Sequence, residues 1–244
     1  MTPKIIVEPN PGQLHRTAAG ALTGLIEEAT TAGRDFTLAL AGGSTPRGLY
    51  QTLAGAAFAP HIPWEAVKIF FGDERTVPPD HADSNYHMAC EALLNHVPVK
   101  AGRVYRMAGE HADPAQAARD YAAIVNQEVA KDDEGFPRFD LVLLGLGPDG
   151  HIASLFPGTE ILDVEAETAA AVWVPQHNTW RISLTYPVIN RARHLWLLAT
   201  GEAKADIVAR ILDPASPVTY PAQRLAPLGE YRWFLDAAAA ARLD

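Results

Sequence analysis

Two polar side chains that could carry out acid–base chemistry stand close together in LGLGPDGHIASLFPG, the stretch from Leu144 to Gly158 that follows the apolar run FDLVL. Asp149 and His151 are two residues apart there, in a turn rich in glycine. A neutral imidazole can take a proton from water, and a nearby carboxylate raises the pKa of that imidazole. We therefore identify His151 as a candidate general base and Asp149 as a group that orients it. We expect His151 on the opening turn of a short helix, whose dipole favours the neutral ring.

The same stretch contains a glycine pattern that suggests a different ligand. Gly145, Gly147 and Gly150 spell G-x-G-x-x-G after an expected strand, which is the spacing of a dinucleotide-binding loop. However, Pro148 has no N–H to offer a pyrophosphate, and Asp149 would repel it. The letters FPG also end any following helix within two turns. The glycines are better explained by a sharp turn that approaches a small ligand closely.

A second glycine-rich turn, GGSTP, lies between an apolar run and the start of an expected helix. Two glycines, two hydroxyl groups and a helix N-terminus suit a phosphate monoester. No lysine follows the glycines, so this is not a nucleoside-triphosphate loop. The alternative is an ordinary helix N-cap followed by proline. The candidate phosphate-binding residues of this turn are Gly42, Gly43, Ser44 and Thr45.

Charged side chains follow the apolar run VKIFF in the sequence GDER. Arg75 could neutralise a substrate anion or a developing oxyanion, and Asp73 could orient a hydroxyl group or a water molecule. The alternative is an ion-pair cluster on the surface. Two more cations, Arg181 in WRIS and Lys204 near the start of a helix, are candidates for binding an anion, although each alone is more often a surface cation. A lysine in the first turn of a helix opposes the helix dipole, which is easier to understand if an anion binds there.

Metal and covalent chemistry find weaker support. His81 and His87 have two aspartates near them, but no metal-ligand spacing such as H-E-x-x-H occurs in the sequence. Ser154 is not in a G-x-S-x-G turn, and Cys90 has no partner nearby in sequence. We therefore expect neither a catalytic metal nor a covalent intermediate.

The elements that position these residues alternate between strands and helices. Apolar runs predict strands at 5–7, 36–41, 67–71, 141–144, 171–175, 181–185, 194–200 and 233–235. Apolar residues at helical spacing predict helices that begin near residues 11, 46, 114 and 201. The chain has no internal repeat and no long linker. We expect a single doubly wound, Rossmann-like α/β domain over 1–244, with a mostly parallel sheet, helices on both faces and the active site at the carboxyl ends of the strands.

The composition narrows the classes of partner. The 20 Lys and Arg residues against 29 Asp and Glu residues give a net charge of −9, which disfavours binding to nucleic acid or to an anionic membrane. An anionic substrate would then need a locally basic pocket. The single cysteine fits a reducing compartment, and no apolar run is long enough to span a bilayer. We expect a cytoplasmic protein, either a monomer or a small homo-oligomer.

Taken in chain order, the motifs closely resemble those of the 6-phosphogluconolactonase family. The resemblance covers roughly residues 36–236 and rests on LAGGSTP, FFGDERTVPPDHADSNY, LGLGPDGHIASLFPG, WRISLTYPVIN and TGEAKADIV. It implies hydrolysis of 6-phospho-D-glucono-1,5-lactone, a sugar-phosphate lactone, without a metal or an organic cofactor. In this reading the GGSTP turn, Arg181 and Lys204 hold the phosphate, and His151 activates water. Arg75 stabilises negative charge, while Asp149 and Asp73 orient the imidazole or the substrate.

Glucosamine-6-phosphate deaminases belong to the same superfamily and offer a competing function. They typically carry a glutamate a few residues after the histidine, which assists opening of the sugar ring, and that position is Phe156 here. They also have M-D-E-Y where this chain has G-D-E-R. Because a lactone needs no such ring opening, these departures favour the lactonase. A non-catalytic sugar-phosphate sensor is the second alternative, although the chain has no appended DNA-binding helix pair or basic arm.

Overall fold

The computed structural model describes residues 2–243 and is built around a six-stranded parallel sheet. In spatial order its strands are β1 (Lys4–Glu8), β9 (Glu230–Asp236), β8 (His194–Ala199), β5 (Leu141–Gly145), β2 (Phe36–Leu40) and β3 (Val67–Phe71). Every neighbouring pair in this sheet is parallel. The apolar runs of the sequence become these strands because a parallel sheet is buried on both faces.

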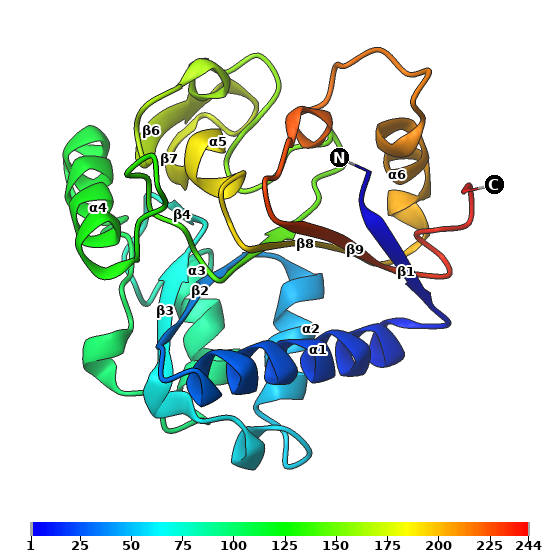
Figure 1. The fold of residues 1–244 in the computed structure, drawn as a ribbon. Coiled ribbons are helices and arrows are strands. Elements are labelled where there is room, and N and C mark those ends of the chain that lie inside the picture. Colours follow the sequence, from blue (N-terminus) through cyan, green and yellow to red (C-terminus); the bar gives the residue numbers. More distant parts are fainter. Residues whose placement is uncertain (1, 244) are drawn as a thin grey trace.

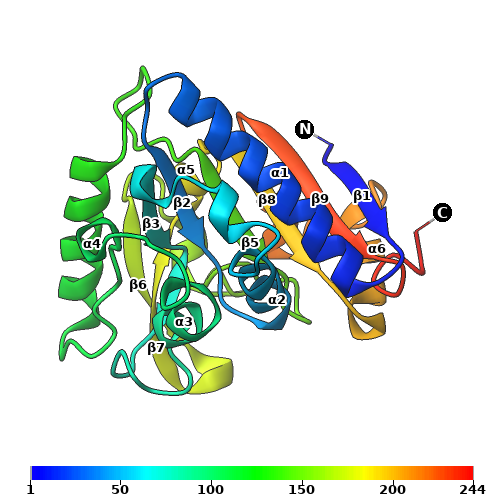
Figure 2. The ribbon, with the colours of Figure 1, turned by 90° about the horizontal axis from the view of Figure 1, so that it is seen from below.

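Helices cover both faces of the sheet (Figure 1). On one face lie α1 (Pro11–Thr31), α2 (Ser44–Leu53) and α3 (Asn85–Ala89), and on the other lie α4 (Pro114–Glu128), α5 (Tyr186–Ile189) and α6 (Ala205–Leu212). Figure 2 shows α1 extended across the sheet, where it contacts β1, β2 and β9. In β5, Leu141 and Leu143 belong to the hydrophobic core that includes α1, whereas Val142 and Leu144 belong to the core that includes α4, α5 and α6. The predicted α/β fold with helices on both faces is confirmed.

Short turns connect these elements. They are the 3-10 turns η1 (Ala59–His61), η2 (Trp64–Ala66), η4 (Ala101–Arg103), η5 (Glu160–Asp163), η6 (Pro175–His177), η7 (Glu202–Lys204) and η8 (Pro221–Arg224), and the π-helical turn η3 (Cys90–Leu94). Lys204 therefore ends a 3-10 turn and directly precedes α6, close to its predicted place in a first helical turn. No helix among residues 2–243 is long and apolar enough to cross a membrane.

A second, antiparallel sheet, which the sequence did not predict, adjoins the central one through Gly72. It consists of β4 (Asp73–Arg75), β7 (Thr179–Leu184) and β6 (Ala169–Val174), in that order. The strands expected at 171–175 and 181–185 exist, but they pair with each other across a short turn in which Asn178 is left-handed, with φ +48°. So short a connection can join only antiparallel strands, since a parallel pair needs a crossover of a dozen residues or more.

The short helix expected after Gly150 does not form. The segment 148–158 consists of turns, with one isolated bridge between Ile152 and Leu155. Ala153 adopts a left-handed backbone, with φ +46°, which cannot continue a right-handed helix. The prediction that a helix dipole acts on His151 is therefore wrong, and the environment of the imidazole must come from side chains.

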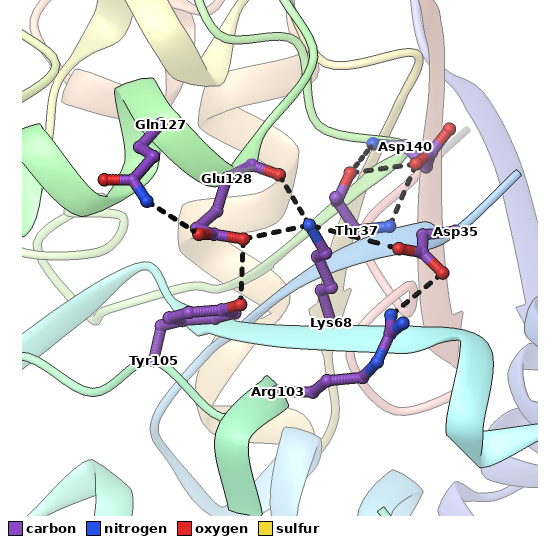
Figure 3. Close-up of polar contacts among 8 residues, drawn as sticks. All are labelled: Asp35, Thr37, Lys68, Arg103, Tyr105, Gln127, Glu128 and Asp140. Carbon is purple, nitrogen blue, oxygen red and sulfur yellow. Dashed lines mark hydrogen bonds and ion pairs between the residues drawn. The ribbon is translucent and has the colours of Figure 1, made fainter. Parts of the chain in front are cut away.

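Charged groups at the amino edge of the sheet pair with one another (Figure 3). Lys68 Nζ lies 3.0 Å from Glu128 Oε2, and Arg103 Nη1 lies 2.8 Å from Asp35 Oδ1. The buried carboxylate of Asp140 accepts hydrogen bonds from Thr37 N at 2.9 Å and Thr37 Oγ1 at 2.8 Å. These bonds join α4 to β3 and β5 to β2, so the charge at this edge stabilises the fold.

Candidate active site

A pocket of about 290 Å³ opens at the carboxyl edge of the central sheet. Its walls are the segment after β2, the segment after β5, the segment after β8, and β4 and β7 of the small sheet. Ligand-binding sites of open α/β sheets occupy this edge. The volume lies just below the usual range for drug-sized ligands, so it suits a small molecule better than a dinucleotide.

Nine of the ten candidate residues line this pocket, although they come from five separate segments of the chain. They are Gly42, Gly43, Ser44, Thr45, Asp73, Arg75, His151, Arg181 and Lys204. The tenth, Asp149, does not line the pocket and instead contacts His151. The fold thus gathers the candidates in one place, and their individual roles remain predictions.

His151 and Asp149 are in close polar contact beside the pocket. His151 Nδ1 lies 2.5 Å from Asp149 Oδ1, and the backbone N–H of His151 donates to the same oxygen at 3.2 Å. Burial acts to raise the pKa of the Asp149 carboxyl, but its hydrogen bond to His151 and the histidine charge outweigh this effect and lower the pKa below its usual value. Asp149 is therefore held as an anion beside the imidazole.

Neighbouring residues fix the plane of the His151 ring. Phe156 stacks on it with ring centroids 4.0 Å apart and an interplanar angle of 27°. A Cβ added to Gly147 would stand 2.1 Å from His151 Nδ1. Gly147 is therefore required for close packing of this ring, and not for contact with a pyrophosphate.

The GGSTP turn leads into α2, and neither of its hydroxyl groups caps the helix N-terminus. Gly43 is the N-cap residue, with φ +98°, and no side chain caps this helix terminus. Gly43 and Pro46 thus form an N-cap followed by proline, and no side-chain hydrogen bond occupies the helix terminus. Thr45 Oγ1 shares a 2.8 Å hydrogen bond with Thr200 Oγ1, which ties the turn to the end of β8. The N–H groups of a first helical turn lack intrahelical partners and can bind an anion.

Three cations face the pocket without a carboxylate partner among the described residues. Lys204 forms no ion pair there, and burial lowers the pKa of its ammonium group against the opposing effect of Asp149. Arg75 and Arg181 are register partners across β4 and β7, and both have a buried Nε without a hydrogen-bond partner. Burial, and next the charge of Arg75, lower the pKa of Arg181. Because like charges across a strand pair are destabilising, this arrangement is suited to a bound anion.

The two acids of GDER have different environments. Glu74 is buried and accepts hydrogen bonds from Arg75 N, Asn85 N and Tyr86 N, and also from Ser84 Oγ at 3.0 Å. Burial raises the pKa of Glu74 in spite of these bonds. Glu74 thus anchors the start of α3. Asp73, also buried, lines the pocket and accepts from Ser154 Oγ and Asn85 Nδ2.

Asn85, Ser154 and His177 line the pocket as well, and sequence reasoning missed them as site residues. From the sequence, Ser154 is weighed only as a nucleophile, and His177 lies in the turn between β6 and β7, three residues before the motif WRISLTYPVIN. Its ring packs edge-on to Phe156, with centroids 5.5 Å apart. Asn85 lies inside the motif FFGDERTVPPDHADSNY and Ser154 inside LGLGPDGHIASLFPG, and these positions are the only sequence signal for them.

The histidines that resembled metal ligands in composition lie apart from the pocket. His81 approaches Asp83, and His87 approaches Glu91. Among residues 2–243, no three side chains of His, Cys, Asp or Glu converge in a way that could hold a metal ion.

The parallel sheet and the cation-lined pocket at its carboxyl edge define an α/β protein whose site suits a small anionic molecule. A family model described as glucosamine-6-phosphate isomerases/6-phosphogluconolactonase matches residues 9–233. The chain therefore belongs to this family.

Individual relatives match along the whole chain. A 6-phosphogluconolactonase of Synechocystis sp. is 38% identical over 244 residues, which cover 100% of this chain and 99% of the relative. One of Mycobacterium tuberculosis is 37% identical with the same coverage. The solved structure of 6-phosphogluconolactonase from Trypanosoma brucei superposes with a TM-score of 0.89 at 30% identity, covering 100% of this chain and 99% of that one.

Proposed function

We propose that this chain hydrolyses 6-phospho-D-glucono-1,5-lactone to 6-phospho-D-gluconate, as the second step of the oxidative pentose phosphate pathway. The family and the names of its relatives support this reaction. The pocket supports it independently, because it combines a histidine–carboxylate pair with three cations that lack a carboxylate partner. The reaction needs an activated water, a site for a phosphate dianion and a group that stabilises an oxyanion.

The contact between His151 Nδ1 and Asp149 Oδ1 is the observation that carries the proposal. An ionised carboxylate can only accept a hydrogen bond, so the imidazole must donate from Nδ1. The neutral ring then has its lone pair on Nε2, where it can accept a proton from water. Water attacks the lactone carbonyl, His151 takes its proton, and the same ring later returns a proton to the departing ring oxygen. Asp149 holds the tautomer and stabilises the imidazolium.

The GGSTP turn and the cations would place the substrate. Backbone N–H groups and the hydroxyls of Ser44 and Thr45, together with Arg181 and Lys204, bind the 6-phosphate in this proposal. Binding energy from the phosphate, which does not react, then orients the carbonyl against the water. Arg75 stabilises the negative charge of the tetrahedral intermediate. Asp73 accepts a hydrogen bond from a substrate hydroxyl.

Phe156 argues against deamination of glucosamine 6-phosphate. Its ring stacks on His151, at the position where a deaminase carries its glutamate. An apolar ring cannot relay a proton during opening of a hexose ring, whereas lactone hydrolysis does not need that relay. A non-catalytic sensor is the other alternative. The contact between His151 and Asp149 argues against it, because a sensor that only binds its ligand does not need an oriented base.

An assay with freshly generated 6-phosphogluconolactone tests the proposal, with spontaneous hydrolysis subtracted. We expect a rate above background and no release of ammonia from glucosamine 6-phosphate. Release of ammonia would favour the deaminase, and binding without turnover of either compound would favour the sensor.

The setting of the enzyme is also part of this proposal. We infer a cytoplasmic location from the single cysteine and from the pathway, and we infer from the net charge of −9 that nucleic acid is not a partner. We also propose a monomer or a small homo-oligomer. We further propose that residues 1–244 act as one domain, because both hydrophobic cores pack on the same central sheet.

A further inference from the structure

The loop that carries His151 is held in an unfavourable backbone conformation. Ala153 has φ +46°, and among the described residues only one other residue besides glycine, Asn178, has a positive φ. A left-handed alanine persists only where its surroundings impose it. The restraint must therefore come from residues next to Ala153.

The turn closed by the bond from Leu155 N–H to Ile152 O contributes part of that restraint, and Ser154 contributes two hydrogen bonds to the small sheet. Its side chain is fully buried, its backbone N–H donates to Ser183 Oγ at 3.2 Å, and its hydroxyl donates to Asp73 Oδ2 at 2.7 Å. Asp73 and Ser183 are register partners across β4 and β7. Ser154 thus forms hydrogen bonds to both members of one cross-strand residue pair, Asp73 on β4 and Ser183 on β7.

The small sheet that Ser154 contacts also carries Arg75 and Arg181. Arg75 and Arg181 form another register pair of the same strands, two residues along from Asp73 and Ser183. Residues two apart in a strand point to the same face of the sheet. The hydrogen bonds of Ser154 therefore attach the loop that carries His151 to the strands that carry the two guanidinium groups.

The phosphate-binding turn is connected to the same carboxylate. Asn85 Nδ2 donates to Asp73 Oδ1 at 3.0 Å, so each oxygen of Asp73 receives one hydrogen bond. A Cβ added to Gly42 would stand 2.1 Å from Asn85 Oδ1, which shows that the turn and this amide are in close contact. Asp73 therefore links the three segments that carry the base, the arginines and the candidate phosphate site.

We propose that Ser154 is a positioning residue, which acts through Asp73 to fix His151 relative to Arg75 and Arg181. The role of these groups in turnover rests on the proposed function, whereas the effect of Ser154 on the position of the His151 ring does not. No covalent role is assigned to the Ser154 hydroxyl, because its proton is committed to Asp73.

The first test replaces Ser154 with alanine and compares the kinetics with those of a matched variant. A misplacement on the order of 1 Å can cost about 100-fold in rate, so we expect Ser154→Ala to lose roughly that factor in kcat with a small change in KM. The control is Thr185→Val, which removes another buried hydroxyl whose bonds go to the carbonyl oxygens of Glu167 and Thr168. It should retain wild-type kcat. Equal kcat values for wild type and Ser154→Ala would overturn the proposal.

A double-mutant cycle tests whether the effect passes through Asp73. If it does, Ser154→Ala should add little to the kcat loss of Asp73→Asn, because the shared contact is already altered. Losses that multiply fully would overturn the route through Asp73. The cycle therefore separates a positioning role from general damage to the fold.

A measurement on the resting enzyme keeps this test independent of turnover. The imidazole ¹⁵N and ¹H resonances of His151 should shift in Ser154→Ala and stay at their wild-type positions in Thr185→Val. Unchanged His151 resonances in Ser154→Ala would contradict the proposal even if kcat fell. If the wild type lacked lactonase activity, the proposed function would fail, while these spectra would still decide the role of Ser154.

Discussion

The two edges of the central sheet use charge in opposite ways. At the amino edge, Lys68 meets Glu128 and Arg103 meets Asp35, so each of these cations has a carboxylate within 3.0 Å (Figure 3). At the carboxyl edge, Arg75, Arg181 and Lys204 line a pocket without an ion pair to any described residue. Folding alone explains the paired charges. The charges without an ion pair are better explained by a ligand that completes them, because holding a charge partly out of water without a counter-charge is costly.

The largest effect is expected from removing the base at the carboxyl edge. General-base catalysis contributes about 10²- to 10⁴-fold, so kcat of His151→Ala should fall by that order while the melting temperature stays near the wild-type value. Steady-state kinetics on the lactone measures this. His61→Ala, which alters a histidine outside the pocket, serves as the control. A His151→Ala enzyme with near-normal turnover would remove this histidine from the mechanism.

A smaller effect is expected from crowding the same ring. The Cβ of Gly147→Ala would overlap His151 Nδ1 at 2.1 Å, so the imidazole must move, and such a displacement can cost about 100-fold in kcat. Gly24→Ala is the matched control, since nothing lies within 4 Å of its Cβ on α1. Similar kcat values for the two variants would show that the ring position is not critical.

Loss of an unpaired cation should change affinity more than rate. A hydrogen bond to a charged group contributes about 1.5–3 kcal/mol, so Lys204→Ala should raise KM for the phosphorylated lactone by roughly 10- to 100-fold. The unphosphorylated glucono-1,5-lactone provides the comparison, because it lacks the group that Lys204 is proposed to bind. An equal effect on both lactones would show that Lys204 does not bind the phosphate.

The smallest effect is expected from a charge at the amino edge, and it should fall on stability. Lys68→Met leaves Glu128 without its cation and should lower the unfolding free energy by about 1–2 kcal/mol with kcat unchanged. The hydrogen bond from Lys68 contributes most to lowering the pKa of Glu128. A carboxyl whose pKa is lower in the folded state binds fewer protons there, so its stabilisation is present at neutral pH and is lost as the pH falls below the ordinary glutamate range.

Urea unfolding at neutral pH and at an acidic pH below the ordinary glutamate range checks this prediction. The destabilisation by Lys68→Met should be larger at neutral pH than at a pH where Glu128 is protonated. If Lys68→Met changed kcat without changing stability, the conclusion that charge at the amino edge serves folding would be contradicted.

The sequence predicted the central sheet well because buried parallel strands appear as short apolar runs, such as VKIFF and LVLLG. It also placed the candidate residues at strand ends, where the structure brings nine of them into one pocket. The conformation of the His151 loop was not predictable in the same way. Its left-handed Ala153 carries no sequence signal, since alanine favours helix and tertiary contacts, those of Ser154 among them, select another backbone.

Pairing in the small sheet was also beyond local reasoning. Arg75 and Arg181 are 106 positions apart in the chain, and only the register of β4 and β7 places them opposite each other. The same holds for Asp73 and Ser154, whose contact depends on the loop after β5 reaching the antiparallel sheet. Local patterns identified the residue types, whereas the tertiary fold determined which of them meet.

Stabilisation by a ligand tests the difference between the two edges most directly. Urea unfolding should be measured with and without 6-phosphogluconate, a stable product that carries the phosphate, and with gluconate as the control. At 100 times its Kd the phosphorylated compound should stabilise the wild type by about 2.7 kcal/mol. At the same concentrations it should stabilise Lys68→Met as much as the wild type, and Lys204→Ala much less. No stabilisation of the wild type, or equal stabilisation by gluconate, would contradict the conclusion that the cations of the carboxyl edge bind a phosphorylated ligand.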